Sequence, residues 1–412
     1  TESLTVFLQQ LGRGLRLSEG KDCLTVLDFV GNSRPEYDFE GKFRALVGKT
    51  KTPIQKEIED DFPHLPLGCA IVLEKKAKTF ILENIRRATS LNRNQLLTKI
   101  KNFKHQTTLP LSLKNFSNFY HIPLQLIYKR GGWKRLCVLC GEIEDFPQIN
   151  ENEIYRAINK KWLSCSSNSY FQFVISLAQK QFNISLHKLS EEERAMCLML
   201  HFDIWQSSDG FISLEESIKA IGKNMILNEE IIEVLGILID KIDFLERKIN
   251  LPYSQPLQIH SRYTRDQILA AFGDHKFDRK SSNREGVVNL ESKNTELLLV
   301  TLEKSEEDYS PTTLYNDYAV SDIMFHWQSQ NSAKPEDGKG QSYIDHQKNS
   351  KLILLFIRER NTDEFGNTMG YVFLGLSNYK EHYGSKPISI TWELSEPMPP
   401  YLWKDSAKMA IG

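Results

Sequence analysis

The chain has 412 residues, of which 40% are hydrophobic and 25% are charged, and its formal net charge is −1. This length allows roughly two to four domains of ordinary globular composition. Near-neutrality excludes a globally basic protein, so a contact with nucleic acid would need a local basic patch. No apolar run reaches the roughly 18 residues that cross a membrane. Six scattered cysteines are typical of a reducing compartment, so we expect a cytoplasmic protein without a membrane partner.

The first 32 residues predict a helix followed by a strand. Apolar residues recur at helical spacing from Leu4 to Leu15. Residues 24–30 form a β-rich run of the kind that is buried in an α/β sheet. Gly12 and Gly14 interrupt the helical pattern, where each glycine costs up to ~1 kcal/mol, and this indicates close approach by another group. The chain starts at Thr1 without a signal-peptide pattern, so we expect a processed chain or a fragment.

A motif within this helix carries the clearest chemistry. The residues Gln9, Gly12, Arg13 and Arg16 form the pattern Q-x-x-G-R-x-x-R. The pattern resembles motif VI of superfamily 2 helicases and translocases, which lies on a helix of the second RecA-like domain. The resemblance implies that Gln9 and Gly12 face the nucleotide and that Arg13 and Arg16 are an arginine-finger pair. Arginine suits this task because its planar fork reaches phosphate oxygens bidentately. The alternative is an exposed helix with two arginines.

The other half of an ATPase site is missing from the sequence. Residues 48–50, Gly-Lys-Thr, mimic the end of a phosphate loop, but Phe43 stands where the first glycine is needed. No D-E-x-H box is present. We therefore expect this chain alone to be inactive and to hold no cofactor. ATP and Mg²⁺ would belong to the full-length protein, whose first RecA-like domain would lie upstream.

Several further segments resemble one family, the uncharacterised C-terminal region of bacterial DEAD/DEAH-box, restriction-type helicases. They include residues 43–46, 59–69, 263–267, 309–313, 325–330, 373–375 and 388–392. The resemblance implies a role in defence against phage or foreign DNA. It also implies that a phospholipase-D-type nuclease domain can lie upstream. Within this chain no H-x-K-x-x-x-x-D motif occurs, so we expect no such nuclease here.

The apolar patterns and residue composition change along the chain, and they predict an α+β multidomain fold in three regions. Residues 1–32 would be the end of a RecA-like α/β domain, and residues 33–250 a mainly α-helical connector. In the connector, Ser190 and Glu193 form a capping box before an apolar run, and residues 227–249 carry one apolar face. Residues 251–412 would be a mostly β module, with strand-like runs at 297–302, 352–357, 370–376 and 388–394.

Aromatic, amide and imidazole side chains concentrate in the β-rich region, which predicts a pocket that stacks a base and reads its edge. On a strand, His326 and Gln328 would point one way and Trp327 the other. Arginines nearby would contact phosphates. The candidate nucleic-acid-binding residues are His326, Trp327, Gln328, Tyr371, His382, Arg358 and Arg360. The alternative is that the aromatic residues fill the core of a small β structure.

Two weaker patterns favour structural interpretations. Cys137 and Cys140 have zinc-like spacing, but no second ligand pair follows, so we predict no metal site. Residues 75–104 form the most basic stretch of the chain, and the basic side chains could follow a phosphate backbone. A solvated helix face is the slightly favoured interpretation.

Two functional hypotheses remain. The first is the C-terminal part of a DNA helicase or translocase of a bacterial defence system, with DNA as the partner and a C-terminal module that reads it. The second is a protein-interaction or assembly platform that does not read DNA itself. The near-neutral charge favours the second slightly, whereas the aromatic and amide cluster favours the first. An oligomer is compatible with both.

Overall fold

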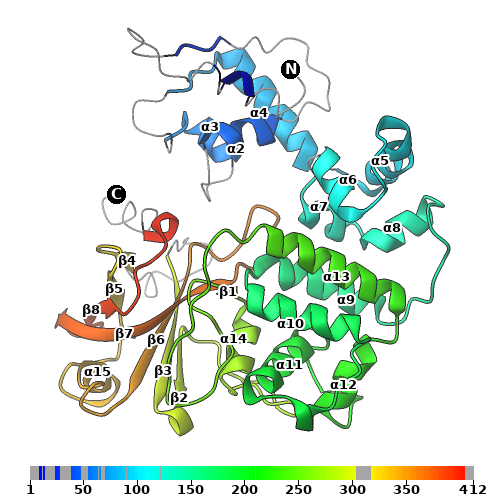
Figure 1. Ribbon diagram of the computed structural model, residues 1–412. Coiled ribbons are helices and arrows are strands. Elements are labelled where there is room, and N and C mark those ends of the chain that lie inside the picture. The colour runs from blue at the N-terminus through cyan, green and yellow to red at the C-terminus, as the bar shows by residue number, and fades with distance from the viewer. Residues whose placement is uncertain are drawn as a thin grey trace. The chain divides into compact units, whose positions relative to one another are not determined.

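The computed structural model describes residues 9–11, 13, 24–27, 39–47, 54–63, 65, 70–89, 91–120, 122–208, 210–302 and 317–403. The fold is mixed α+β, as predicted, with a sheet in the C-terminal part (Figure 1). The chain divides into two compact units, Thr1–Arg130 and Gly131–Gly412, which we call unit 1 and unit 2. The helices of residues 131–240 and the sheet belong to the same unit. The domain borders expected at 32/33 and 250/251 stay predictions.

The described elements of unit 1 are helices. They are α2 (Phe39–Val47), α3 (Ile54–Glu59), α4 (Lys75–Thr89), α5 (Arg93–Gln106), α6 (Leu113–Tyr120) and α7 (Leu124–Lys129). One apolar cluster joins α2, α3 and α4, with Phe43, Ile58 and Ile81 at its centre. The basic stretch forms α4 and the following α5, which begins with a capping box in which Asn92 and Gln95 bond reciprocally.

The strand expected at residues 24–30 is not observed in its described part. Residues 24–27 have no regular secondary structure and are exposed, with 79% of the Leu27 surface accessible. A strand is held by hydrogen bonds to a neighbouring strand, and the described residues of unit 1 provide none. The prediction of a buried strand is therefore wrong for residues 24–27, while residues 28–30 lie outside the described part.

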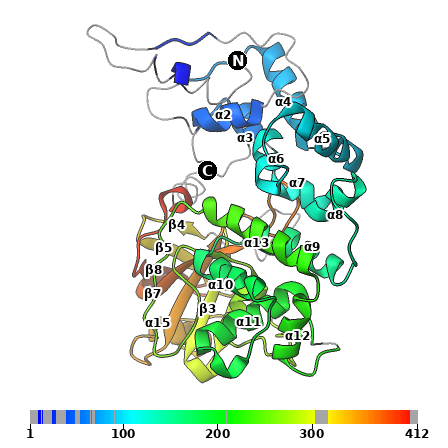
Figure 2. The same cartoon turned by 45° about the vertical axis from the view of Figure 1, so that its right-hand side comes forward.

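Unit 2 begins with a layer of helices, followed by the sheet and the short helices associated with it (Figures 1 and 2). The layer comprises α8 (Trp133–Leu139), α9 (Glu151–Lys160), η1 (Trp162–Ser164), α10 (Asn168–Gln179), η2 (Leu186–Lys188), α11 (Glu191–Ile204), α12 (Leu214–Ile221) and α13 (Met225–Asp240). The predicted capping box of α11 is confirmed, because Ser190 and Glu193 exchange hydrogen bonds of 2.8 and 3.1 Å. Across the described residues, no helix is long and apolar enough to traverse a bilayer.

The sheet of unit 2 has the strand order β2-β3-β6-β7-β8-β5-β4, and β1 pairs with β7. Its strands are β1 (Arg262–Tyr263), β2 (Val287–Leu290), β3 (Thr295–Thr301), β4 (Tyr318–Ala319), β5 (Met324–Gln328), β6 (Leu352–Arg358), β7 (Tyr371–Tyr383) and β8 (Ser389–Leu394). The short helices η3 (Glu291–Lys293), α14 (Arg265–Ala271) and α15 (Gly338–Ile344) complete the unit. The four strand-like runs predicted from the sequence correspond to β3, β6, β7 and β8 and are confirmed.

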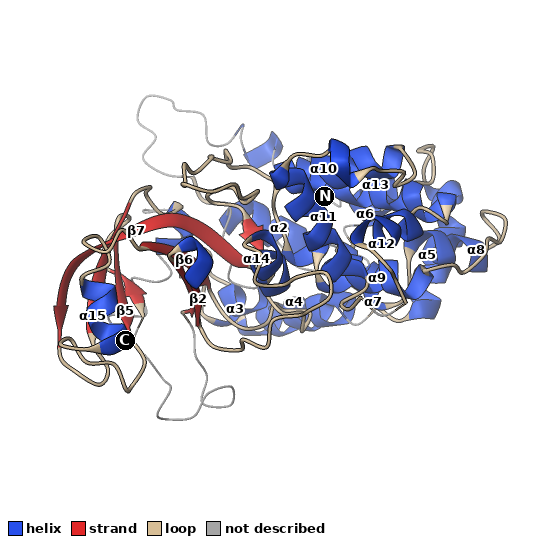
Figure 3. Cartoon of the chain, turned by 90° about the horizontal axis from the view of Figure 1, so that it is seen from below, coloured by secondary structure: helices blue, strands red, loops and turns tan. Residues whose placement is uncertain are grey.

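The long strand β7 makes the sheet continuous and lets it bend. Its first part pairs with β6 and its last part with β8. A bulge interrupts each pairing, and Gly375 adopts φ 85° beside the first bulge. Because bulges bend a strand, the two halves of the sheet enclose one apolar core. Figure 3 shows the curved β7. The core includes Leu355, Trp327 and Trp392, with Tyr343 supplied by α15.

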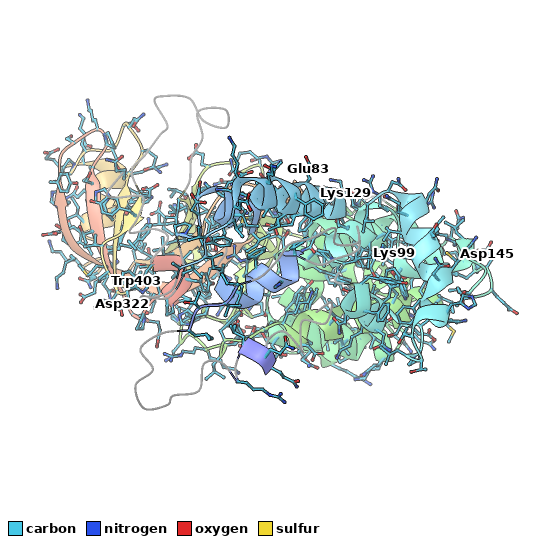
Figure 4. The ribbon with its side chains drawn as sticks, turned by 90° about the horizontal axis from the view of Figure 1, so that it is seen from above. Glu83, Lys99, Lys129, Asp145, Asp322 and Trp403 are labelled. Carbon is cyan, nitrogen blue, oxygen red and sulfur yellow. The ribbon has the colours of Figure 1, made fainter. Side chains whose placement is uncertain are left out.

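The last described residues cover one end of this sheet. The Met398 N–H donates to the Asp322 carbonyl at 2.7 Å, and the Leu394 N–H donates to the Ile323 carbonyl at 2.8 Å. Figure 4 labels Asp322, on the connection between β4 and β5, and Trp403, in the segment after β8. These bonds bring the chain after β8 back to the connection between β4 and β5.

Helix α14 joins the helical layer to the sheet. It packs against α11, and the strand before it, β1, pairs with β7. Asp203 of α11 is fully buried and accepts three hydrogen bonds at one oxygen, Oδ2. The donors are the Trp162 indole at 2.8 Å, the Tyr170 hydroxyl at 2.8 Å and the Gln267 amide of α14 at 2.9 Å. This network links η1, α10, α11 and α14 through a single carboxyl group.

Candidate nucleic-acid interface

Trp327 lies in the core rather than on a binding surface. Its exposed fraction is 5%, and its ring packs edge-on against Tyr343 at 5.2 Å and lies 6.2 Å from the Trp392 ring. The alternation predicted for β5 is observed, since Phe325 and Trp327 join the core while His326 faces the other side of the sheet. The proposed stacking of Trp327 on a base does not fit this position, because an apolar indole gains most from the inward face.

His326 and Gln328 share the outer face of β5. The His326 ring stacks on Tyr318 at 4.5 Å between centroids, and its Nε2 lies 3.1 Å from the Tyr383 hydroxyl. The Gln328 side-chain Nε2 donates to the Ser389 hydroxyl at 3.4 Å, and the Gln328 backbone N–H donates to Asp317 Oδ1 at 2.9 Å. Both predicted readers are therefore engaged by their own neighbours. The exposed part of this face is Tyr383, whose exposed fraction is 61%.

His382 and Arg360 lie apart from the residues above. His382 is exposed near the end of β7, and its Nδ1 is 2.7 Å from the Tyr379 hydroxyl. Arg360 follows β6 and pairs with Glu364 at 3.4 Å. The structure therefore does not gather the predicted residues into one pocket.

Arg358 and Tyr371 are the predicted pair that the structure does bring together. Arg358 ends β6 and Tyr371 begins β7, and the guanidinium carbon lies 4.5 Å from the centroid of the tyrosine ring. Parallel pairing of β3 with β6 places Thr301 opposite Arg358, and the Arg358 Nε donates to the Thr301 hydroxyl at 2.8 Å. Further bonds reach Asn361 Oδ1 at 2.5 Å and the Met369 carbonyl at 3.5 Å. All of these acceptors are neutral oxygens.

Arg265 adds a second guanidinium beside this pair. It is the first residue of α14, and a capping box between Thr264 and Gln267 fixes that helix start. The Arg265 Nη2 donates to Asn283 Oδ1 at 2.9 Å and to the Glu285 carbonyl at 2.8 Å. Its Nε is buried without a hydrogen-bond partner.

Arg265 lies among charges of both signs. Burial lowers its pKa, and the positive charges of Arg284 and Arg358 lower it further, whereas Tyr371 and the Asp266 carboxylate act in the opposite direction. Among the described residues, neither Arg265 nor Arg358 forms an ion pair with a carboxylate. We call Arg265, Arg284, Arg358 and Tyr371 the arginine cluster.

Arg262, close in sequence to the cluster, shows the opposite arrangement. Its two terminal nitrogens bind both oxygens of Glu359 at 2.8 Å, so its charge is compensated. It also donates to the Gly370 carbonyl at 2.7 Å. Arg262 is therefore a structural residue of β1, whereas the arginine cluster retains positive charge that an anion can neutralise.

A hollow of about 450 Å³ adjoins the cluster and shares Arg284 with it, and Asn283, which accepts a hydrogen bond from Arg265, also lines the hollow. Three carboxylates, Glu285, Glu291 and Glu296, also line the hollow. Because like charges repel, these acids disfavour phosphate inside the hollow. An anion is better placed over Arg265 and Arg358 than in this space.

The motif VI residues lie largely outside the described part. Gln9 and Arg13 have helical backbone and exposed side chains. Gly12 and Arg16 lie outside the described residues. Their roles in binding and hydrolysing ATP stay predictions.

The cysteine pair is placed on one short helix. Cys137 is buried in α8, and Cys140 caps the C-terminus of that helix. Burial raises the pKa of the Cys137 thiol well above its usual value. Within the ranges that the structure describes, no group of three or more potential metal ligands occurs.

Part of the chain matches a known family. Residues 257–406 match the family described as "Domain of unknown function (DUF3427)". We call residues 257–406 the DUF3427 segment. No curated protein matches the chain. The segment contains β1 to β8 and the whole arginine cluster, whereas α8 to α13 precede it.

The sequence did not single out Arg265 and Arg284. A signal for Arg265 was present, because the spacing of Thr264 and Gln267 is that of a capping box and places Arg265 in the first turn of a helix. Its approach to Arg358 depends on the pairing of β1 with β7, which local patterns do not reveal.

Proposed function

We propose that this chain is the C-terminal part of a DNA helicase or translocase of a bacterial restriction-type defence system, and that its DUF3427 segment contacts DNA. The observation that carries the DNA contact is the arginine cluster, in which Arg358 packs on the Tyr371 ring and neither Arg358 nor Arg265 forms an ion pair with a carboxylate among the described residues. Guanidinium groups bind phosphate oxygens with charge-assisted, often bidentate hydrogen bonds. The buried Nε of Arg265 adds a donor without a partner.

The motor part of this proposal rests on the resemblance of residues 9–16 to motif VI. In the full-length protein, Arg13 and Arg16 act on ATP and Mg²⁺ held by an upstream RecA-like domain. Gln9 and Gly12 then lie beside the nucleotide. The upstream domain, and a nuclease if one is attached, are the protein partners that this proposal requires, and the compartment is the cytoplasm.

The DNA contact is tested by measuring the binding of the 412-residue chain to labelled single-stranded and duplex DNA by fluorescence anisotropy. We expect Arg358→Gln to lower the steepness of the salt dependence by about one unit, because one phosphate contact is lost. Arg265→Lys keeps a charge but not the planar fork, so it should weaken binding less than Arg265→Gln.

Arg247→Gln is the matched control, because Arg247 is an exposed arginine of unit 2 that pairs with Glu396. This variant should bind DNA like the wild type. If Arg358→Gln and Arg265→Gln also bind like the wild type, the arginine cluster is not the contact. If the wild-type chain binds no DNA at low salt, the assembly-platform hypothesis replaces the DNA-reading one.

A further inference from the structure

An interval of the chain that the arginine cluster does not involve is entirely free of acidic residues. Between Glu83 and Glu142 there is no aspartate or glutamate, although the chain has 53 in total. At the average frequency, an interval of this length would contain about seven. Eleven lysines and arginines lie within it. A chain with a net charge of −1 thus concentrates positive charge in one stretch.

Helix α5 displays this charge on one side. Leu96, Ile100 and Phe103 are fully buried and lie on one face of the helix. The opposite face and its margins carry exposed side chains that can donate hydrogen bonds. We call this set the α5 basic face: Arg93, Asn94, Lys101, Lys104 and His105.

The face is held on a well-defined scaffold. The Phe103 ring packs on Phe116 and Tyr120 of α6, at 6.1 and 6.2 Å between centroids. The Tyr120 hydroxyl donates to the Lys99 carbonyl at 3.2 Å, and the Lys99 Nζ, labelled in Figure 4, lies 4.7 Å from the Tyr120 ring centroid. The Arg130 Nε donates to the Leu91 carbonyl just before α5 at 3.0 Å. The exposed side chains therefore project from a fixed helix.

An ordinary solvated helix face has a different charge pattern. Such faces usually mix both signs, because a glutamate and a lysine one turn apart stabilise a helix. On α5, Lys101 has no aspartate or glutamate one turn away on either side, because the interval contains none. A polyanionic partner would supply negative charge at this position.

We propose that the α5 basic face binds the phosphate backbone of a nucleic acid, as a second contact separate from the arginine cluster. The donors are lysine, arginine, asparagine and histidine side chains, all of which can bond phosphate oxygens, and phosphate contacts carry no sequence information. Binding is therefore independent of sequence and falls steeply with salt. The contact deepens the proposed DNA function but rests on unit 1 alone.

Charge reversal on the full chain tests the inference. The probes are fluorescein-labelled oligothymidine and a labelled random-sequence duplex, measured by anisotropy over a salt series. We expect the double variant R93E/K101E to lose at least about tenfold in affinity at low salt. The single variant K101A should lower the steepness of the salt dependence by about 0.7 for the single strand or about 0.9 for the duplex. Which probe shows the larger loss identifies the strand form that is bound.

Lys223→Glu is the matched control, because it reverses one exposed lysine of unit 2 that follows α12. It should bind within about twofold of the wild type. Far-UV circular dichroism should show that R93E/K101E is folded, since both side chains are exposed. If R93E/K101E binds as tightly as Lys223→Glu, the α5 basic face is not a contact.

The same series separates this inference from the proposed function. If R93E/K101E loses affinity while Arg358→Gln does not, the α5 basic face is the contact and the arginine cluster is not. The reverse result overturns this inference and leaves the proposed function standing. If both lose affinity, the combined variant should show additive losses, because the two sites do not share residues.

Discussion

Asp203 shows how one buried carboxyl group links several elements and lowers stability when it is ionised. Its three donors all bond Oδ2, and the other oxygen, Oδ1, is buried without a partner. Burial raises the pKa of this carboxyl group to about 6, although the hydrogen bonds and Lys161 oppose the shift. Folding therefore destabilises the ionised form of Asp203 relative to its protonated form.

This pKa predicts a pH dependence of stability. Between about pH 4 and pH 6 the unfolded chain loses the Asp203 proton while the folded protein keeps it, so stability falls as the pH rises. A shift of about two units corresponds to about 3 kcal/mol. Asp203→Asn keeps an acceptor for the donors and cannot ionise. Its free energy of unfolding relative to the wild type should therefore rise by about 3 kcal/mol from pH 4 to pH 7.

Urea unfolding of both proteins at the two pH values measures this difference. Other carboxyl groups titrate in both proteins, so their effects cancel in the comparison. A difference that is the same at pH 4 and pH 7 would mean that Asp203 does not ionise in this range.

Trp327 provides a second test at the scale of a residue. Because its ring fills the core between Tyr343 and Trp392, Trp327→Ala should lower the free energy of unfolding by ~3–5 kcal/mol. Gln328→Ala, next to it on the half-buried outer face, should cost less than about 1 kcal/mol. Urea unfolding checks both values. A fully stable Trp327→Ala protein that loses only DNA affinity would restore the base-stacking role.

At the scale of elements, two glycines show which contacts position the strands. Gly370 precedes β7, and a Cβ at this position would lie 2.5 Å from the Ser164 carbonyl oxygen and 2.9 Å from that of Tyr263. Gly236 lies within α13, where a Cβ would meet no atom within 4 Å. One glycine is required by close packing, and the other is not.

The two alanine substitutions should therefore have opposite effects. Gly370→Ala forces backbone atoms apart and should destabilise the protein by about 1–3 kcal/mol. Gly236→Ala should stabilise it by up to about 1 kcal/mol, because alanine favours a helix interior. Thermal unfolding of both variants measures the signs. Equal melting temperatures for the two would contradict the close approach at Gly370.

The same scale shows what the sequence could predict. The strands β3, β6, β7 and β8 and the cap of α11 follow from local patterns, because an apolar run or a capping box acts within a few residues. The end of α13 does not. Its apolar pattern runs to residue 249, whereas the helix ends at Asp240 and Leu245 is 78% exposed. The spacing of apolar residues alone does not reveal where a helix loses the neighbouring elements against which it packs.

The candidate interface was less predictable than the fold. Arg358 and Tyr371 were identified by side-chain type, an arginine that can contact phosphate and an aromatic residue within a strand-like run. Arg265 was not, because its proximity depends on the pairing of two distant segments, β1 and β7. Alternation along β5 predicted that His326 and Trp327 point to opposite faces, but it could not show that the core lies on the side of Trp327.

At the scale of the whole molecule, the motif VI interpretation makes a kinetic prediction. The 412-residue chain should not hydrolyse ATP, because it has neither a phosphate loop nor a magnesium-binding D-E-x-H box. In the full-length protein, Arg13→Ala or Arg16→Ala should lower turnover by ~10³ or more, the scale of an arginine finger. Phosphate release measures both. Wild-type turnover in either variant would remove that arginine from the site.

The position of α14 also affects whether the DUF3427 segment can be transferred alone by recombination. A recombination event that moved only the DUF3427 segment would separate Gln267 from Asp203 and leave the apolar face of α14, with Ile268 and Leu269, open to water. It would also break the pairing between Ser166 and Arg262. Gly131–Gly412 is the compact unit that keeps these contacts, so we expect the helices before the matched segment to be inherited together with it.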